Sequence, residues 1–340
     1  MTEERRRIVI TGLSAICPIG TGVDEIWESV STQRSGISGP TFWPAEALPI
    51  QAVGEARQFT GHIKDFGEMD KESQKNLRKS LKVMCRECQM GVAAAQLALN
   101  DASLNPGNVD PERIGTSFGS DYMVSSPEEF TEGVKACLND EGRFEFPRWS
   151  TDGMPRLFPL WLLKYLPNMP ASHVAIYNDL RGPSNSITMR EASPAICVSD
   201  AMHTIRSDRA DAAVVGVTGT RLSLTKAMHA VQQEEVALAD EKPERACRPF
   251  DLHRKGMVPG EGAAAMILEE LNAARKRGAR IYAEVLAAVS AAALDRNCVA
   301  RRREAIRLAM IGALREAGLQ PTDIGFVMAH GLSTQSCDIE

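Results

Sequence analysis

The sequence predicts an α/β protein in which helices cover a mostly parallel sheet. Apolar runs of strand length, such as residues 211–217 and 263–269, alternate with stretches of helical periodicity along the chain. Hydrophobic residues make up 44% of the chain and aromatic residues only 5%, so the core consists of small aliphatic side chains that suit closely packed layers. The 340 residues can bury a large core, in two domains or in one internally repeated unit.

The first expected element is a short buried strand at residues 7–12, which closes on a glycine turn, and a helix begins within residues 23–27. Residues 40–80 contain several Gly, Pro and charged residues, and we interpret them as an excursion over the surface rather than as core. The further strands are expected at residues 113–120, 211–217, 263–269, 281–290 and 324–329, and the further helices at residues 79–100, 127–138, 271–276 and 302–318.

Charge and composition argue against several classes of protein. The net charge of −5, without a coherent basic face, gives no support for nucleic-acid binding. No apolar run approaches the length of a membrane span, and no signal peptide precedes the first strand. The eight cysteines are scattered and do not form a disulfide framework, so a reducing cytoplasm is the expected compartment.

Two short motifs and the histidines carry little functional signal. Cys85 and Cys88 form a C-x-x-C pair, but no second pair accompanies them and no thioredoxin-like strand precedes them. Residues 260–262 (GEG) are only a fragment of a phosphate-binding loop. The six histidines lie far apart, so no metal site is expected.

Four segments are more informative when they are taken together. They are residues 8–20 (IVITGLSAICPIG), residues 166–187 (ending in LRGPSNSI), residues 248–262 (RPFDLHRKGMVPGEG) and residues 327–338 (VMAHGLSTQSCD). In this order they resemble the elongating β-ketoacyl-[acyl-carrier-protein] synthases of fatty acid and polyketide assembly. The likeness covers essentially the whole chain.

The resemblance implies a thiolase-like fold, in which two βαβαβαββ halves form five layers, αβαβα, in an obligate dimer. Residues 1–255 would be the first half with insertions, and residues 256–340 the beginning of the second. We therefore expect the natural protein to continue past Glu340, and these residues alone to be poorly soluble, because sheet edges and apolar helix faces would be uncovered. Acyl carrier protein would be the partner, with substrates on its phosphopantetheine arm and no further cofactor.

The resemblance also locates the nucleophile. In that family a cysteine opens a buried helix and accepts the acyl chain, nine residues after the glycine of a Gly-Pro pair, and counting from Gly182 gives Glu191. A second anchor, the Asp that opens a buried strand twenty residues later, falls on Asp211, so the two anchors agree without a gap. The nearest thiol, Cys197, fits a buried core cysteine better. Cysteine-dependent condensation is therefore disfavoured.

Glu191 leaves several functions open. The helix N-terminus would stabilise its carboxylate, but a carboxylate is a poor acyl acceptor from a thioester. Relatives with glutamine at this position include loading decarboxylases and chain-length factors, which pair with an active synthase. Glu191 would repel a malonyl carboxylate unless it is protonated or paired, with Arg190 as the candidate partner. This favours a chain-length-factor-like partner subunit, in a homodimer or in a heterodimer with a cysteine-bearing synthase.

The alternatives are an enzyme and an inert protein. The enzyme would be a hydrolase or decarboxylase of acyl thioesters that uses Glu191 with His330, which matches the family's first catalytic histidine but also fits a core histidine at a strand end. The inert paralogue would use Glu191 only as a helix cap. Thr334 matches the second of two threonines that hold the phosphopantetheine arm, while Leu332 replaces the first. Phe250 matches a loop near the active site.

Overall fold

The computed structural model describes residues 5–44, 46–105, 107–238 and 242–340. Their main sheet has the strand order β2-β1-β8-β7-β5-β6, with β9 paired to β1. The strands are β1 (Ile8–Cys17), β2 (Gly20–Thr21), β5 (Ile114–Ser120), β6 (Ser184–Thr188), β7 (Ala212–Thr220), β8 (Glu261–Glu270) and β9 (Ala283–Glu284), while β3 (Ile37–Ser38) and β4 (Val53–Gly54) form a separate pair. The helices are α1 (Val23–Ser31), α2 (Lys71–Ser80), α3 (Arg86–Ala102), α4 (Thr131–Ala136), α5 (Met169–Asn178), α6 (Ser193–Arg206), α7 (Leu224–Gln233), α8 (Leu271–Lys276) and α9 (Arg302–Ala317).

The prediction of a mostly parallel sheet is wrong. Among the described strands of this sheet, only the pairings β5–β6 and β5–β7 are parallel, whereas β7–β8 and β8–β1 are long antiparallel pairings. The sequence was misleading because both faces of β7 and β8 are covered. A strand buried on both faces has a nearly continuous apolar run whatever the direction of its neighbour.

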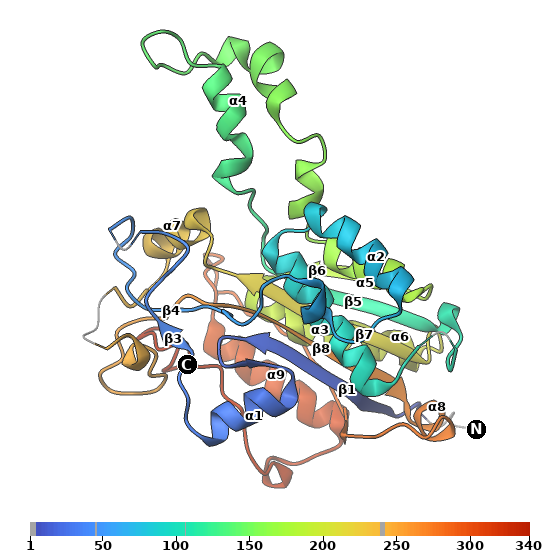
Figure 1. Cartoon of the computed structure of the whole chain (residues 1–340). Helices are drawn as coiled ribbons and strands as arrows, with labels where there is room; N and C mark the ends of the chain where they lie inside the picture. The colour runs from blue at the N-terminus through green and yellow to red at the C-terminus, as the bar shows by residue number, and fades with distance from the viewer. Residues whose placement is uncertain (1–4, 45, 106, 239–241) are drawn as a thin grey trace.

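Helices cover both faces of the sheet, and the alternation of residues in β7 shows how. Ala212 and Val214 belong to the core cluster that contains α3 and α5, while Ala213 and Val215 belong to the cluster that contains α6. Successive residues of a strand point to opposite faces. The helices α3 and α5 therefore lie on one side of the sheet and α6 on the other (Figure 1).

Small residues let these layers approach closely. A Cβ atom on Gly12 of β1 would lie 2.4 Å from the carbonyl oxygen of Ala98 in α3, and one on Gly216 of β7 would lie 2.1 Å from the ring of Phe118. Both distances are too short for any side chain. The alanine-rich sequence of α3 is thus matched by a glycine on β1, while Gly216 makes room within the sheet for the Phe118 ring of β5.

The interpretation of residues 40–80 as surface is wrong. Phe66 and Leu77 are fully buried and join the cluster beneath α3, and Ile50 and Val53 are fully buried in another cluster. The Gly, Pro and charged residues of this segment reflect its many turns, while its apolar side chains, spaced without a regular period, fill the core. The expected helix at residues 79–100 is also divided, because α2 ends at Ser80 and α3 begins at Arg86.

Residues 127–166, which we call the arm, project from the body of the molecule (Figure 1). The helix expected at residues 127–138 is a 3-10 turn (Pro127–Phe130) followed by α4, which ends at Ala136. The two sides of the arm are joined by an edge-to-face contact between Phe130 and Trp161, with ring centroids 5.0 Å apart, and by an ion pair of 2.7 Å between Lys164 and Glu129.

The last sixty residues have little regular structure apart from α9, whose expected range is confirmed. The strand predicted at residues 281–290 is reduced to the two residues of β9, and the strand predicted at residues 324–329 is absent. A strand needs a neighbour for its N–H and C=O groups, and no described strand lies beside residues 324–329.

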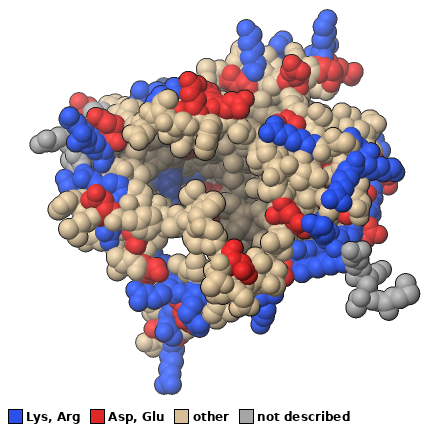
Figure 2. Space-filling model, turned by 90° about the horizontal axis from the view of Figure 1, so that it is seen from below, with Lys and Arg blue, Asp and Glu red and all other residues tan. Residues whose placement is uncertain are grey.

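An apolar groove of about 750 Å³ lies between α9, residues 284–287 and residues 319–327. Phe326 and Met328 are largely exposed. The view from below shows a hollow with mostly uncharged walls and charged side chains around it (Figure 2). None of the described helices is long and apolar enough to cross a membrane.

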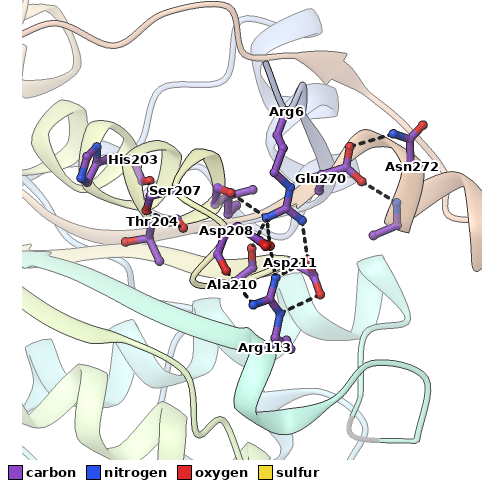
Figure 3. A network of polar contacts seen from close by, with 12 residues as sticks. Arg6, Arg113, His203, Thr204, Ser207, Asp208, Ala210, Asp211, Glu270 and Asn272 are labelled. Carbon is purple, nitrogen blue, oxygen red and sulfur yellow. Dashed lines mark hydrogen bonds and ion pairs between the residues drawn. The ribbon is translucent and has the colours of Figure 1, made fainter. Parts of the chain in front are cut away.

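The end of the sheet where β7 begins is held by four charged residues, Arg6, Arg113, Asp208 and Asp211, which we call the hub (Figure 3). Both carboxylate oxygens of Asp211 accept hydrogen bonds from Arg113 at 2.9 Å. Arg6 donates to the backbone carbonyls of Ile205 and Ala210 at 2.7 and 3.0 Å. The hub therefore ties the chain before β1 to the starts of β5 and β7.

Candidate functional site

The turn between β6 and α6 carries Glu191, the residue that the family resemblance aligns with a nucleophile. It consists of a 3-10 turn (Arg190–Ala192), and Arg190 has a φ of 52°, a left-handed conformation that is uncommon for a residue with a side chain. The backbone N–H of Met189 donates to the Ser193 hydroxyl at 2.8 Å, and that hydroxyl donates to the Ser120 carbonyl at 3.1 Å. These bonds hold the sharp turn against the end of β5.

A cavity of about 680 Å³ adjoins this turn. Most of its wall is made of small or apolar residues from β1, β7, β8 and the following loops, including Ile16, Val217, Met257, Ala263 and Leu332. Its charged lining residues are Asp121, Arg190, Glu191, Arg221 and Glu261. The cavity thus combines a long apolar wall with a charged region at the turn, which suits an acyl chain with a polar head.

Glu191 lies at the mouth of the cavity and is not buried. Its side chain is 48% exposed, and its Oε1 accepts a hydrogen bond of 2.5 Å from Nη2 of Arg221, the residue that follows β7. The helix that it precedes, α6, buries only one side, through residues such as Cys197 and Ile205. The expectation of a fully buried helix at this turn is therefore only half met.

Glu191 belongs to a closed ring of alternating charges, which we call the charge ring. Arg190 donates to Glu234 Oε1 at 2.5 Å, Arg221 donates to the same oxygen, and Arg221 also holds Glu191. The circuit closes between Arg190 Nε and Glu191 Oε2 at 3.9 Å. The carboxylate of Asp121 lies 3.8 Å from Arg190. The predicted partner of Glu191, Arg190, is thus the more distant of two arginines.

The two arginines of the charge ring lower the pKa of Glu234. Burial by itself would raise the pKa of Glu234, but hydrogen bonds from Arg221 and Arg190 outweigh it and place the pKa below the usual value. Glu234 therefore remains ionised around neutral pH and can accept from both arginines.

A buried ion pair lies under the same end of β7. Lys226 Nζ donates to both carboxylate oxygens of Glu87, at 2.9 and 3.0 Å, and both side chains are almost fully buried. The backbone N–H of Thr220 also donates to Glu87, at 3.3 Å, while the Lys226 ammonium lies over the ring of Tyr122. This pair joins α3 and α7 to the strand that carries Arg221.

Comparison with known proteins identifies the fold and the family. The model of the β-ketoacyl synthase N-terminal domain matches residues 5–274, and the model of the C-terminal domain matches residues 282–340. The chain belongs to the β-ketoacyl synthase family. Its thiolase-like fold, predicted from the sequence, is confirmed.

Relatives of known name cover most of the chain. The 3-oxoacyl-[acyl-carrier-protein] synthase 2 of Synechocystis sp. is 30% identical over 99% of this chain and 75% of its own length. The synthase of the same name from Staphylococcus aureus is 31% identical over the same shares. Among solved structures, a β-ketoacyl synthase from Burkholderia phymatum has a TM-score of 0.79 at 25% identity, covering 98% of this chain and 76% of its own. The ishigamide ketosynthase/chain length factor has a TM-score of 0.72 at 26% identity, covering 98% and 75%.

The other residues matched to family positions lie outside the cavity wall. His330 is exposed, and none of the described residues forms a hydrogen bond with its ring, although the next two residues line the cavity. Thr334 is buried and its hydroxyl accepts a hydrogen bond from the backbone of Cys337 at 3.1 Å. Phe250 is 55% exposed, and its N–H donates to Asp338 at 2.9 Å. Arg190 and Glu191 are lining residues of the cavity, whereas these three are not.

Cys197 and Cys85 are poorly placed for acyl transfer, because neither lines the cavity. Cys197 is fully buried in α6, and burial raises its pKa to about 11. Cys85 precedes α3, and burial raises its pKa to about 12, which is the opposite of a redox-active thiol. Cys17 and Cys247 line the cavity, but burial raises the pKa of Cys247 as well. Among the described residues, no group of three His, Cys, Asp or Glu could hold a metal ion.

Sequence reasoning missed Arg221, Glu234 and the Lys226–Glu87 pair. These charges come from distant segments, and no spacing rule connects them to Glu191. One available signal was the placement of Arg221 directly after a confidently predicted strand, since residues at strand ends often reach a functional site.

The expectation that no basic face exists is wrong. Five exposed basic residues share one face of α2 and the turn after it, because they recur at helical spacing: Lys71, Lys75, Arg78, Lys79 and Lys82. None of them has an ion-pair partner among the described residues. In a protein with a net charge of −5, these five side chains form a local concentration of positive charge.

Proposed function

We propose that this ketosynthase-like chain is a non-condensing subunit of fatty acid or polyketide synthesis, which pairs with a cysteine-bearing ketosynthase in the manner of a chain-length factor. The observation that carries the proposal is the engagement of Glu191 with Arg221 inside a complete charge ring. A carboxylate in this position holds the turn together and offers no sulfur for acyl transfer. His330 is exposed and forms no hydrogen bond with a described residue, which gives no sign of a histidine paired with Glu191 and supports the same conclusion.

The edge strand β6 supports pairing with another subunit. It bonds to β5 on one side, and no described strand lies on its other side. Ser184, Asn185 and Thr188 are exposed. An open sheet edge invites another strand, and proteins usually protect such edges. The likeness to the ishigamide ketosynthase/chain length factor agrees with a paired arrangement.

The basic face of α2 supports docking of an acyl carrier protein. The named relatives act with such a carrier, and an acidic partner would be steered by five unpaired positive charges. Reversing two of them, in Lys75→Glu/Lys79→Glu, should weaken binding of the holo carrier by about tenfold or more at low salt. The matched control Lys276→Glu, an exposed lysine on α8, should change binding less than twofold. Equal effects of the two variants would exclude this face.

The pairing is tested by co-expression with cysteine-bearing ketosynthases of the same organism, followed by capture through a tag on this chain. Stoichiometric co-purification with one of them is the expected result, and a chain that purifies alone with each of them contradicts the proposal. Glu191→Cys tests the pocket separately: covalent loading from an acyl carrier would show that the cavity still accepts an acyl chain. Glu191→Gln is the matched control, since it removes the charge without supplying a thiol.

A second candidate function is hydrolysis of an acyl thioester with Glu191 as general base for water. The exposure of its carboxylate beside a large cavity favours it. Turnover of acyl and malonyl carrier proteins should then disappear in Glu191→Ala. Because His330 does not line the cavity and forms no hydrogen bond with Glu191, His330→Ala should leave that turnover unchanged.

A further inference from the structure

The two terminal nitrogens of Arg221 have different partners. Nη1 is held by Glu234, whose side chain is 22% exposed and is shared with Arg190. Nη2 is held by Glu191, whose side chain is 48% exposed and lies at the mouth of the cavity. Arg221 itself is only 17% exposed. One side of the guanidinium is therefore fixed inside the charge ring. The other side holds the Glu191 carboxylate, which is exposed enough to swing away and be replaced by another group.

A guanidinium with a free edge is a good receptor for a carboxylate. If Glu191 moved away, Nη2 of Arg221 would face the charged region of the cavity, next to the apolar wall formed by residues such as Val217 and Ala263. A ligand with a carboxylate at its end and an acyl thioester behind it would fit this combination. Glu191 occupies the place that such a carboxylate would take.

We propose that Arg221 is an anion subsite for the carboxylate of carboxyacyl thioesters of the malonyl type, and that Glu191 fills it as an internal competitor. The chain therefore admits neutral acyl groups and excludes carboxyacyl groups. This inference rests on the proposed assignment of the cavity as an acyl pocket, but not on pairing with another subunit.

Local charge supports the exclusion. With Glu191 in place, the positive charges of Arg190 and Arg221 meet the negative charges of Glu191, Glu234 and Asp121, which leaves one net negative charge. An incoming carboxylate is repelled, and Nη2 of Arg221 already donates to Glu191. Replacing Glu191 by glutamine brings the local charge to zero without changing the size of the side chain. The neutral amide oxygen holds Nη2 less strongly than a carboxylate does, so an incoming carboxylate can displace it.

The test is calorimetric binding of two ligands to the full chain: malonyl-pantetheine, which carries a carboxylate, and butyryl-pantetheine, which has nearly the same size without charge. The unaltered protein should prefer butyryl-pantetheine. Glu191→Gln should bind malonyl-pantetheine about tenfold more tightly than the unaltered protein, as expected for a charge-assisted hydrogen bond, with butyryl binding unchanged within twofold. Glu304→Gln, which alters an exposed ion pair on α9, is the control and should change neither.

The double variant Glu191→Gln/Arg221→Gln should lose the gain for malonyl-pantetheine. If it does not fold, as judged by its thermal transition, Glu191→Gln/Arg221→Lys replaces it. Lysine keeps the positive charge but lacks the paired N–H donors of the guanidinium. An equal gain for both ligands, or a gain that survives without Arg221, would overturn the proposal. Absence of binding by either ligand in all variants would overturn the acyl-pocket assignment beneath it. The co-purification experiment stays independent of these outcomes.

Discussion

The two ends of β7 each carry a group of arginines and carboxylates, but the two groups are built differently. At the beginning of the strand, the arginines of the hub bond to backbone carbonyls as well as to Asp208 and Asp211. At its end, the charge ring is made of side chains alone and borders the cavity. The hub fixes the path of the chain, whereas the ring can rearrange without moving the backbone. Similar residue types thus serve structure at one end and a ligand site at the other.

The largest effect is expected for the buried ion pair of Lys226 and Glu87 beneath the charge ring. Its loss of stability is the reference for the smaller losses expected at the two ends of β7. Lys226→Met should lower the free energy of unfolding by about 3–5 kcal/mol, because Glu87 would be left buried without a charged partner. Urea denaturation measures this. The double variant Lys226→Met/Glu87→Met should recover most of the loss, since both charges are gone. A double variant as unstable as the single one would show that packing, not charge, dominates here.

The next largest effect is expected at the hub. Asp211→Asn should lower the free energy of unfolding by about 2 kcal/mol, because it weakens charge-assisted hydrogen bonds from Arg113 and Arg6 that define the start of β7. Asp208→Asn is the matched comparison: its side chain is 74% exposed, so its loss should be well below that of Asp211→Asn. If the two variants lost the same free energy of unfolding, Asp211 would not be the central residue that the geometry of the hub indicates.

The lowered pKa of Asp211 should make the stability contributed by the hub depend on pH. Hydrogen bonds from Arg113, opposed by burial and assisted by Arg6, hold the pKa of Asp211 below its usual value. A carboxyl with a lowered pKa in the folded state contributes stability that is present above its unfolded pKa, about 3.9, and is lost as the pH falls through the folded value. Denaturation between pH 6 and pH 2 should therefore show an acid loss that is smaller in Asp211→Asn.

The smallest effect is expected at the charge ring. Glu234→Gln should lower the free energy of unfolding by about 1 kcal/mol or less, because the ring is partly exposed and tied to no backbone carbonyl. The same change should make the melting temperature less sensitive to added salt. A loss as large as that of Asp211→Asn would mean that the ring is a structural element like the hub, and would remove the contrast between the two ends.

The sequence predicted the parts of the site that depend on local order along the chain. Counting from Gly182 and checking against Asp211 placed Glu191 correctly in the turn before α6. The count succeeds because the spacing between these two anchors matches the family without a gap. Arg221 and Glu234 could not be predicted in the same way. They reach Glu191 only because β7 and α7 bring distant segments to one place, and charged side chains carry no periodic signal of their partners.

The errors in the fold have a similar origin. The run at residues 324–329 is apolar enough for a strand, but a strand forms only beside another, and that condition cannot be seen within the run itself. The buried residues Phe66 and Leu77 lie in a stretch of turns whose composition is typical of a surface. In both cases the deciding interaction is tertiary, and local composition gives no measure of it.

The pairing of β1 with β8 has a consequence for how the protein is made. Ile8 lies opposite Glu270, so the first long strand finds its main partner more than two hundred and fifty residues later. At about 5–20 residues per second, a ribosome needs tens of seconds to deliver that partner. During this interval a strand of mostly apolar residues has little to pair with beyond β2. Nascent chains of this protein should therefore depend on chaperones that shield their N-terminal end until translation has passed β8.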